Sequence, residues 1–256
     1  MKKLLTAVTV AVLAVSAGVA QAKDWKQIRI GVDASYAPFE SKSSDGKLVG
    51  FDIDLGNEIC KRVHAKCVWV ENDFDGMIPG LKAKKFDGVL SSMTVTPERE
   101  KEIAFSKPLF ETPTALVAKK GSSVKPTAES LKGKSVGVEQ GTTQEKYAKD
   151  NWAAKGVNVV AYQNQDQVYQ DLISGRLDAA LQDKVQAEVG FLKQPRGAQF
   201  QQAGDEIQSG AAAMGLRKDD ADLKALVDKA IDDMMKDGTY KKIEKRYFDF
   251  DVAPKS

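Results

Sequence analysis

The sequence of 256 residues is poor in the side chains that most metal sites and catalytic triads require. It contains one histidine, His64, and two cysteines, Cys60 and Cys67. A zinc site of histidine and cysteine, a serine triad or a cysteine protease would have almost nothing to work with. We therefore expect no metal, no cofactor and no catalytic residue.

The chain also lacks a strong charge of one sign. It has 38 Lys+Arg and 36 Asp+Glu, a formal net charge of +2. A surplus this small excludes a protein that binds nucleic acid by electrostatics. Hydrophobic content of 42% and charged content of 29% are ordinary for a soluble fold, and the length suits one large unit or two modest lobes.

Long apolar runs are absent after the N-terminus. Residues 1–22 combine Lys2 and Lys3, an apolar stretch from Leu4 to Val15, and Ala20-Gln21-Ala22 as a cleavage site. This is the pattern of a secretory signal peptide, whereas a membrane anchor would need a longer stretch. Because Lys2 and Lys3 are the only charges in this segment, we expect an exported mature chain with no net charge.

Export bears on the two cysteines. Cys60 and Cys67 lie at the end of a predicted amphipathic helix and just before Val68-Trp69-Val70. Nearby cysteines form a disulfide in an oxidising compartment, whereas free thiols would be expected in the cytosol. We expect a structural disulfide that stabilises the fold by about 2–3 kcal/mol. His64, inside the loop, is expected at the surface.

Strand and helix patterns alternate along the mature chain. Alternating apolar residues predict strands over 28–32, 68–70 and 88–90, and helical spacing predicts helices over 55–63 and 75–83. This order is typical of an α/β fold with largely parallel sheets. The order then recurs, since Arg29–Asp33 resembles Ser135–Glu139 and Leu81–Leu90 resembles Leu172–Leu181. Chance similarity between βα units is the alternative to a duplicated lobe.

The predicted division places lobe 1 at 23–111, lobe 2 at 112–208 and the C-terminal part of lobe 1 at 209–256. Prolines suggest an extended crossing over Pro108–Lys125, and small residues suggest a return near Ala203–Gly215. Later helices, over 223–234 and 240–247, are expected to pack on lobe 1.

Polar residues gather where predicted strands end and helices begin. Ligands of open α/β sheets bind at such places. Thr96 and Pro97 have the pattern of a helix start, and Thr142 and Asp183 each begin a capping-box pattern. The residues at the four strand ends are Asp33 with Tyr36, Ser91 with Ser92 and Thr94, Thr142 with Thr143, and Asp183.

Arg99 is the most informative single residue. A cation in the first turn of a helix opposes the helix dipole unless an anion is bound there. Arg99 could hold a carboxylate through two hydrogen bonds, or it could be a solvated arginine balanced by Glu98 and Glu100.

Asp183, Tyr36 and Phe74 also allow two interpretations each. Asp183 could cap its helix or pair with an ammonium group. Tyr36 and Phe74 could flank an aliphatic stem or stack on a cation, and they could equally pack in the core. The residues alone leave these alternatives open.

The motifs together resemble the periplasmic amino-acid-binding proteins of ABC importers, and most closely their lysine/arginine/ornithine- and histidine-binding branch. The resemblance covers nearly the whole mature chain, and the Cys60/Cys67 spacing matches the disulfide of that branch. The residues that carry it are Tyr36–Phe39, Gly50–Leu55, Ser91-Ser92, Thr96–Arg99, Lys132–Lys134, Gln144, Asp150–Trp152, Gly175–Asp183, Gly190–Pro195 and Asp237–Tyr240.

The resemblance implies a type II periplasmic binding protein of two α/β lobes that close over one free amino acid. Arg99, helped by backbone N–H groups of Thr94 and Thr143, would hold the α-carboxylate. Asp183 would pair with the α-ammonium with help from Ser92. The remaining implied roles are a cationic side chain facing Asp33, its methylenes between Tyr36 and Phe74, hydrogen bonds from Ser91 and Gln144, and Thr142 lining the cleft.

Two departures from the branch stand out. The return segment around Gln208–Gly215 is several residues shorter than usual, and Glu139 replaces a residue that is usually apolar. By the repeat, Glu139 is the counterpart of Asp33. Two carboxylates at one pocket repel each other when it is empty, so we expect Glu139 to favour cationic ligands. The alternative is a Glu139 side chain turned to solvent.

These features predict a periplasmic, monomeric protein that binds a basic amino acid and delivers it to the membrane permease of an ABC importer. The first alternative is an exported dehydratase on the same scaffold, with Glu139 or Asp183 as the general acid. The second is a sensor that signals to a separate receptor. The sequence does not rank arginine, lysine, ornithine and histidine.

Overall fold

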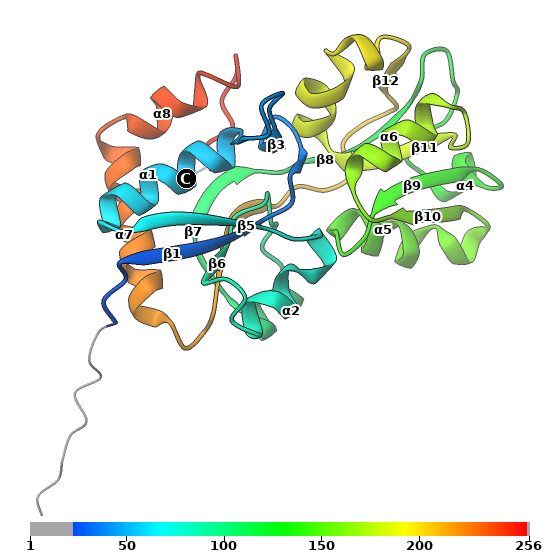
Figure 1. Ribbon diagram of the computed structural model, residues 1–256. Coiled ribbons are helices and arrows are strands. Elements are labelled where there is room, and N and C mark those ends of the chain that lie inside the picture. The colour runs from blue at the N-terminus through cyan, green and yellow to red at the C-terminus, as the bar shows by residue number, and fades with distance from the viewer. Residues whose placement is uncertain (1–22, 255–256) are drawn as a thin grey trace, which may run out of the picture.

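The computed structural model describes residues 23–254, which form two lobes, each with its own five-stranded sheet (Figure 1). The predicted signal peptide, 1–22, lies outside these residues. In the first sheet β1 pairs in parallel with β5 and β6, and β13 pairs antiparallel with β6 and β7. Its strands are β5 (Lys66–Glu71), β1 (Gln27–Val32), β6 (Gly88–Val89), β13 (Ala211–Leu216) and β7 (Ala104–Glu111).

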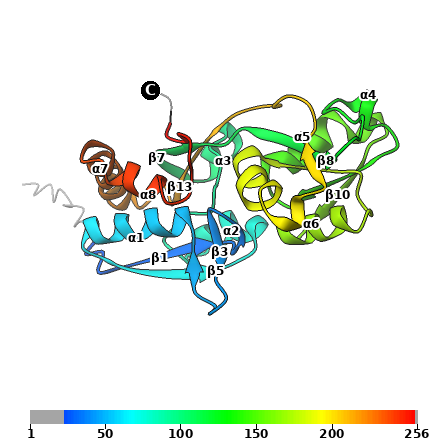
Figure 2. The same ribbon diagram turned by 90° about the horizontal axis from the view of Figure 1, so that it is seen from above.

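The helices of lobe 1 come from both ends of the chain. Helices α7 and α8 pack against α1, so the C-terminal segment packs on lobe 1 as predicted (Figure 2). The elements are α1 (Phe51–Val63), α2 (Met77–Lys82), α3 (Pro97–Glu102), α7 (Ala221–Lys236) and α8 (Thr239–Glu244), with a small sheet of β2 (Ser35–Tyr36), β3 (Glu40–Lys42) and β4 (Leu48–Val49).

The second sheet follows the same plan. In this sheet β9 lies between β10 and β11 and is parallel to both. In the first sheet β1 lies in the same way between β5 and β6. The repeat expected from the sequence is therefore present in the fold. The elements are β10 (Asn158–Tyr162), β9 (Ser135–Glu139), β11 (Ala179–Asp183), β8 (Thr114–Lys119) and β12 (Phe200–Gln202), with α4 (Ala128–Leu131), α5 (Thr143–Asn151), α6 (Gln165–Ile173) and a π-helix (Gln186–Leu192).

The chain passes between the sheets at two neighbouring places. Residues 112–113 join β7 to β8, and residues 203–210 join β12 to β13. The two crossings are tied by backbone bonds from Thr112 N–H to Gly210 O, at 2.6 Å, and from Thr114 N–H to Gln208 O, at 2.7 Å. The predicted extended crossing over Pro108–Lys125 is wrong in extent, because most of it forms β7 and β8.

A disulfide joins Cys60 at the end of α1 to Cys67 in β5, with a Cα–Cα distance of 5.7 Å. His64 lies between them and is exposed, as predicted from the sequence. It ends α1 in the left-handed conformation, with φ 60°, a role that the sequence analysis did not predict. Among the described residues, no helix has the length and apolar character to span a membrane.

Replacing both cysteines with serine is expected to lower the free energy of unfolding by about 2–3 kcal/mol, because the unfolded chain regains the entropy of an open loop. Ligand affinity is expected to stay unchanged, since neither cysteine lines the cavity described below. Urea unfolding of the oxidised protein and the double variant measures the difference. Equal stability of the two proteins would show that the bridge does not stabilise the fold.

Candidate functional site

A cavity lies between the two lobes and is lined by residues of both. All twelve ligand-binding residues predicted from the sequence line it, together with Glu40, which was not predicted. The lining residues are Asp33, Tyr36, Glu40, Phe74, Ser91, Ser92, Thr94, Arg99, Glu139, Thr142, Thr143, Gln144 and Asp183.

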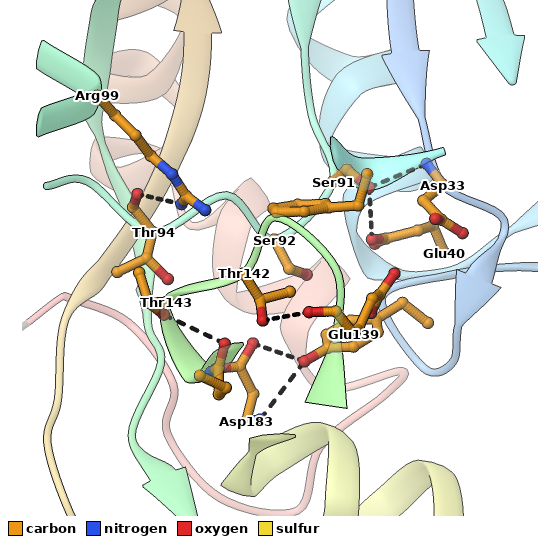
Figure 3. Close-up of a pocket in the computed structure, with 13 residues that line it drawn as sticks. Asp33, Glu40, Ser91, Ser92, Thr94, Arg99, Glu139, Thr142, Thr143 and Asp183 are labelled. Carbon is orange, nitrogen blue, oxygen red and sulfur yellow. Dashed lines mark hydrogen bonds between the residues drawn. The ribbon is translucent and has the colours of Figure 1, made fainter. Parts of the chain in front are cut away.

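The ends of parallel strands bring the acidic and hydroxyl side chains together. Asp33 follows β1, Ser91 follows β6 after one residue, Glu139 ends β9 and Asp183 ends β11. Parallel neighbours end at the same edge of a sheet, and the two sheets present these edges to one cavity. Figure 3 shows Arg99 on one side of the cavity and Asp33 and Glu139 on the other.

Arg99 is held in place by backbone carbonyl groups from both lobes. Thr96 caps α3 by accepting the Arg99 N–H, at 3.2 Å. The guanidinium donates to Thr94 O at 2.7 Å and to Gly141 O at 3.0 Å, and lies 5.4 Å from the centre of the Phe74 ring. The solvated-arginine interpretation is therefore wrong. Burial lowers the pKa of Arg99 to about 10, so the group stays charged at neutral pH.

Asp183 accepts hydrogen bonds from both lobes and does not cap its helix. Its carboxylate accepts from the Tyr36 hydroxyl at 2.9 Å and from Gln144 Nε2 at 2.6 Å. Burial raises the pKa of Asp183 to about 6, and the bonds from Tyr36 and Gln144 and the charge of Arg99 oppose this rise. Asp183 is thus ionised at neutral pH and faces the cavity.

The two aromatic residues combine the roles that were left open. Tyr36 belongs to the buried core of lobe 1, and its hydroxyl still reaches Asp183. Phe74 packs at the edge of a second cluster in lobe 1 and presents its ring to Arg99. Both residues also line the cavity, so core packing and ligand contact are compatible.

The start of α5 forms the second-lobe wall. Thr142 Oγ1 accepts the Glu145 N–H at 3.1 Å, as the capping pattern predicted, and donates to Glu139 O at 2.7 Å. Glu145 accepts the Gly141 N–H at 2.7 Å. Gly141 has φ +77°, and a Cβ atom there would lie 2.7 Å from Asp75 Cα, so only glycine allows this close approach of the lobes.

Asp33 and Glu139 meet from opposite lobes. They are 7% and 3% exposed, so the interpretation of Glu139 as a solvated side chain is wrong. Burial and the neighbouring Asp33 carboxyl raise the pKa of Glu139 well above its usual range. Burial also raises the pKa of Asp33, and hydrogen bonds from Ser35 and Glu139 oppose that rise. No cation lies within ion-pair distance of either carboxyl among residues 23–254.

Two buried acids behind the serines were missed. Glu40 Oε1 accepts from Ser91 Oγ at 2.9 Å, and Asp52 Oδ2 accepts the Ser92 N–H at 2.7 Å. Burial raises the pKa of Asp52 to about 7. Ser92 has φ 50°, a conformation that the bond to Asp52 helps to hold. A sequence signal existed for Asp52, since it lies on the face of α1 that also carries Gly56 and Ile59.

Metal coordination has no support in the geometry. Within the described part of the chain, no group of three or more histidine, cysteine, aspartate or glutamate residues is arranged to hold a metal ion. The site offers one half-buried guanidinium, several carboxylates and two aromatic rings, which are groups that recognise a small organic ion.

Comparison with known proteins agrees with this architecture. The chain is 53% identical to the lysine/arginine/ornithine-binding periplasmic protein of Escherichia coli K12 and 50% identical to its histidine-binding periplasmic protein, in each case over 98% of this chain and 99% of the relative. An ancestral arginine-binding protein bound to arginine has a TM-score of 0.83 at 41% identity, covering 87% of this chain and 98% of that one.

The two-lobed structure is the type II periplasmic binding protein fold, as the sequence predicted. The family model described as bacterial extracellular solute-binding proteins, family 3, matches residues 28–250, which span both lobes. The chain therefore belongs to the bacterial extracellular solute-binding proteins of family 3.

Proposed function

We propose that this protein captures a free basic amino acid in the periplasm and delivers it to the permease of an ABC importer. The observation that carries the proposal is the distribution of charge in the cavity. Among residues 23–254, Asp33 and Glu139 line one end of the cavity without an ion-pair partner, while Arg99 lies on the other side and donates only to backbone carbonyl groups. An amino acid with a cationic side chain complements both ends.

The α-carboxylate of the ligand is assigned to Arg99. A guanidinium forms strong paired hydrogen bonds with a carboxylate. Thr94 and Thr143, whose backbone N–H groups would assist, line the same cavity. The α-ammonium is assigned to Asp183, with Ser92 assisting. Asp183 is ionised at neutral pH, and its bonds to Tyr36 and Gln144 leave it oriented toward the cavity.

The side chain of the ligand is assigned to the Asp33 end. Its methylenes would lie between Tyr36 and Phe74, with Ser91, Gln144 and Thr142 completing the wall. Relatives at 50–53% identity are named for binding lysine, arginine, ornithine or histidine, which supports a ligand of this class. The family consists of solute-binding proteins, so the chain is a binding protein rather than an enzyme.

Capture requires the lobes to separate and close. The crossings at 112–113 and 203–210 are the only covalent connections between the two described sheets, so we assign the hinge to them and keep the predicted lobe limits of 111/112 and 208/209. Bonds that join the closed lobes include Tyr36 to Asp183, Arg99 to Gly141, and Gln163 Nε2 to Asp73 at 2.7 Å. Closure would also create the surface that a permease recognises.

A thermal-shift screen of the mature protein against the common amino acids tests the proposal. Arginine, lysine, ornithine or histidine is expected to raise the melting temperature strongly, because a ligand that binds only the folded state stabilises it. Glutamate and leucine should have no effect at the same concentration, since each leaves the Asp33 end without a cation. Stabilisation by glutamine or glutamate alone would contradict the proposed ligand class.

A further inference from the structure

The acid pair of Asp33 and Glu139 is built from opposite lobes at one end of the cavity. Both side chains are buried and both line the same cavity. Asp33 Oδ1 accepts the Ser35 N–H at 3.0 Å and the Ser35 hydroxyl at 2.7 Å. Asp33 Oδ2 is buried and accepts no N–H or O–H bond from any residue in 23–254.

Within residues 23–254, no lysine or arginine forms an ion pair with either member of this acid pair. The nearby positive groups are engaged elsewhere, since Arg99 donates to backbone carbonyls and lies across the cavity. The other charged or titratable groups around the pair are Asp183, Glu40, Tyr36 bonded to Asp183, Asp166 paired with Arg196 at 2.9 Å, Lys42 paired with Glu71 at 2.8 Å, and Asp73 bonded to Gln163.

Two buried carboxylates at one end of a closed cavity cannot both stay ionised without a positive charge beside them. In the closed cleft that charge has two possible sources: the cationic end of a ligand side chain, or a proton held by the pair. Burial raises the pKa of both groups, and the neighbouring Asp33 carboxyl raises that of Glu139 further.

We infer that the acid pair carries one positive charge in every closed complex, so that a neutral ligand closes the cleft only together with a proton. The preference for cationic over neutral ligands then depends on pH. This inference rests on the proposed function, because it takes the side chain of the ligand to lie at the Asp33 end.

The sign of the effect follows from proton linkage. The complex with a neutral ligand holds one proton more than the complex with a cationic ligand, so rising pH weakens the neutral ligand relative to the cationic one. The protonation state of the free protein is common to both ligands and cancels in the ratio. Asp183 and Asp52 also titrate in this range but meet the same ligand groups in both complexes, so they cancel as well.

Arginine and citrulline provide the matched ligands, since citrulline has a neutral ureido group in place of the guanidinium. For the wild-type protein, we expect the ratio of the citrulline Kd to the arginine Kd to rise at least tenfold between about pH 5.5 and about pH 8, with a limiting slope of about tenfold per pH unit. Calorimetry in buffers of different ionisation enthalpy should show about one more proton taken up with citrulline than with arginine.

Glu139→Gln removes the shared proton while keeping the shape of the side chain. In this variant the ratio of the citrulline Kd to the arginine Kd is expected to change less than about twofold over the same pH range. Glu139→Leu serves the same purpose if the glutamine variant is unstable. Glu100→Gln is the control for loss of one carboxylate, because Glu100 is exposed on α3 and does not line the cavity. It should keep the wild-type pH dependence.

The outcomes separate the two proposals. If arginine binds tightly but the ratio is independent of pH, or if Glu139→Gln keeps the wild-type slope, the inference is overturned and the proposed function stands. If no basic amino acid binds at any pH, the proposed function fails and the inference falls with it.

Discussion

Replacing Arg99 with alanine is expected to weaken the binding of arginine by at least about 100-fold, or about 3 kcal/mol. The guanidinium is held by Thr94 O and Gly141 O and has no carboxylate partner in the described range 23–254. In the complex, the Arg99 guanidinium would be the main positive charge that faces the ligand carboxylate. Its removal leaves that carboxylate desolvated and poorly paired. Titration calorimetry of the variant with arginine measures the loss.

Agmatine, which is arginine without the carboxylate, tells carboxylate recognition from a general disturbance of the cleft. Arg99→Ala should change agmatine affinity little, because the interaction that it removes is absent from that ligand. Arg176→Ala is the matched control: Arg176 is an exposed arginine paired with Asp171, and its loss should leave both affinities unchanged. Equal loss for arginine and agmatine in Arg99→Ala would contradict the assigned role.

Replacing Asp183 with asparagine is expected to reduce arginine affinity by about 100-fold at pH 7.5, because the buried ammonium loses its opposite charge. The deamino analogue 5-guanidinovalerate lacks this ammonium and should bind the variant at least as well as it binds the wild type. Calorimetry with both ligands separates the loss of the ammonium partner from a change in the shape of the cleft. Parallel losses for the two ligands would show that Asp183 acts on the shape of the cleft rather than on the ammonium.

The pH dependence of this pairing has a definite sign. The pKa of Asp183 is about 6 in the ligand-free cleft, so the carboxylate is ionised at pH 7.5. Below about pH 6 the group takes up a proton, and its contribution to ammonium binding is lost as pH falls further. The Asp183→Asn variant lacks this group and should not show that part of the decline.

The fold was predictable to the extent that local patterns determine it. The recurrence of Arg29–Asp33 in Ser135–Glu139 predicted two sheets with the same strand plan, which the structure has. The extended crossing predicted over Pro108–Lys125 was too long, because its prolines were taken to mark chain between the lobes whereas most of the segment forms β7 and β8. Pro108 lies in β7, at the edge of its sheet, where a missing N–H removes no central ladder bond.

The site residues at strand ends were predictable for a similar reason, since parallel strands end at the same edge of a sheet. The alternatives for Arg99 could not be decided from local sequence, because the deciding contact comes from Gly141 in the other lobe. Glu40 was missed because it reaches the site through Ser91, which is 51 residues away along the chain. Contacts of this range depend on tertiary packing.

Calorimetric titration of the mature protein with arginine, lysine, ornithine and histidine, set against glutamine and glutamate at pH 7.5, tests the central claim most directly. The charge distribution of the cavity predicts saturable binding of at least one basic amino acid to a single site, with glutamate failing to compete. Saturable binding of glutamine or glutamate, with no heat from any basic amino acid, would contradict it.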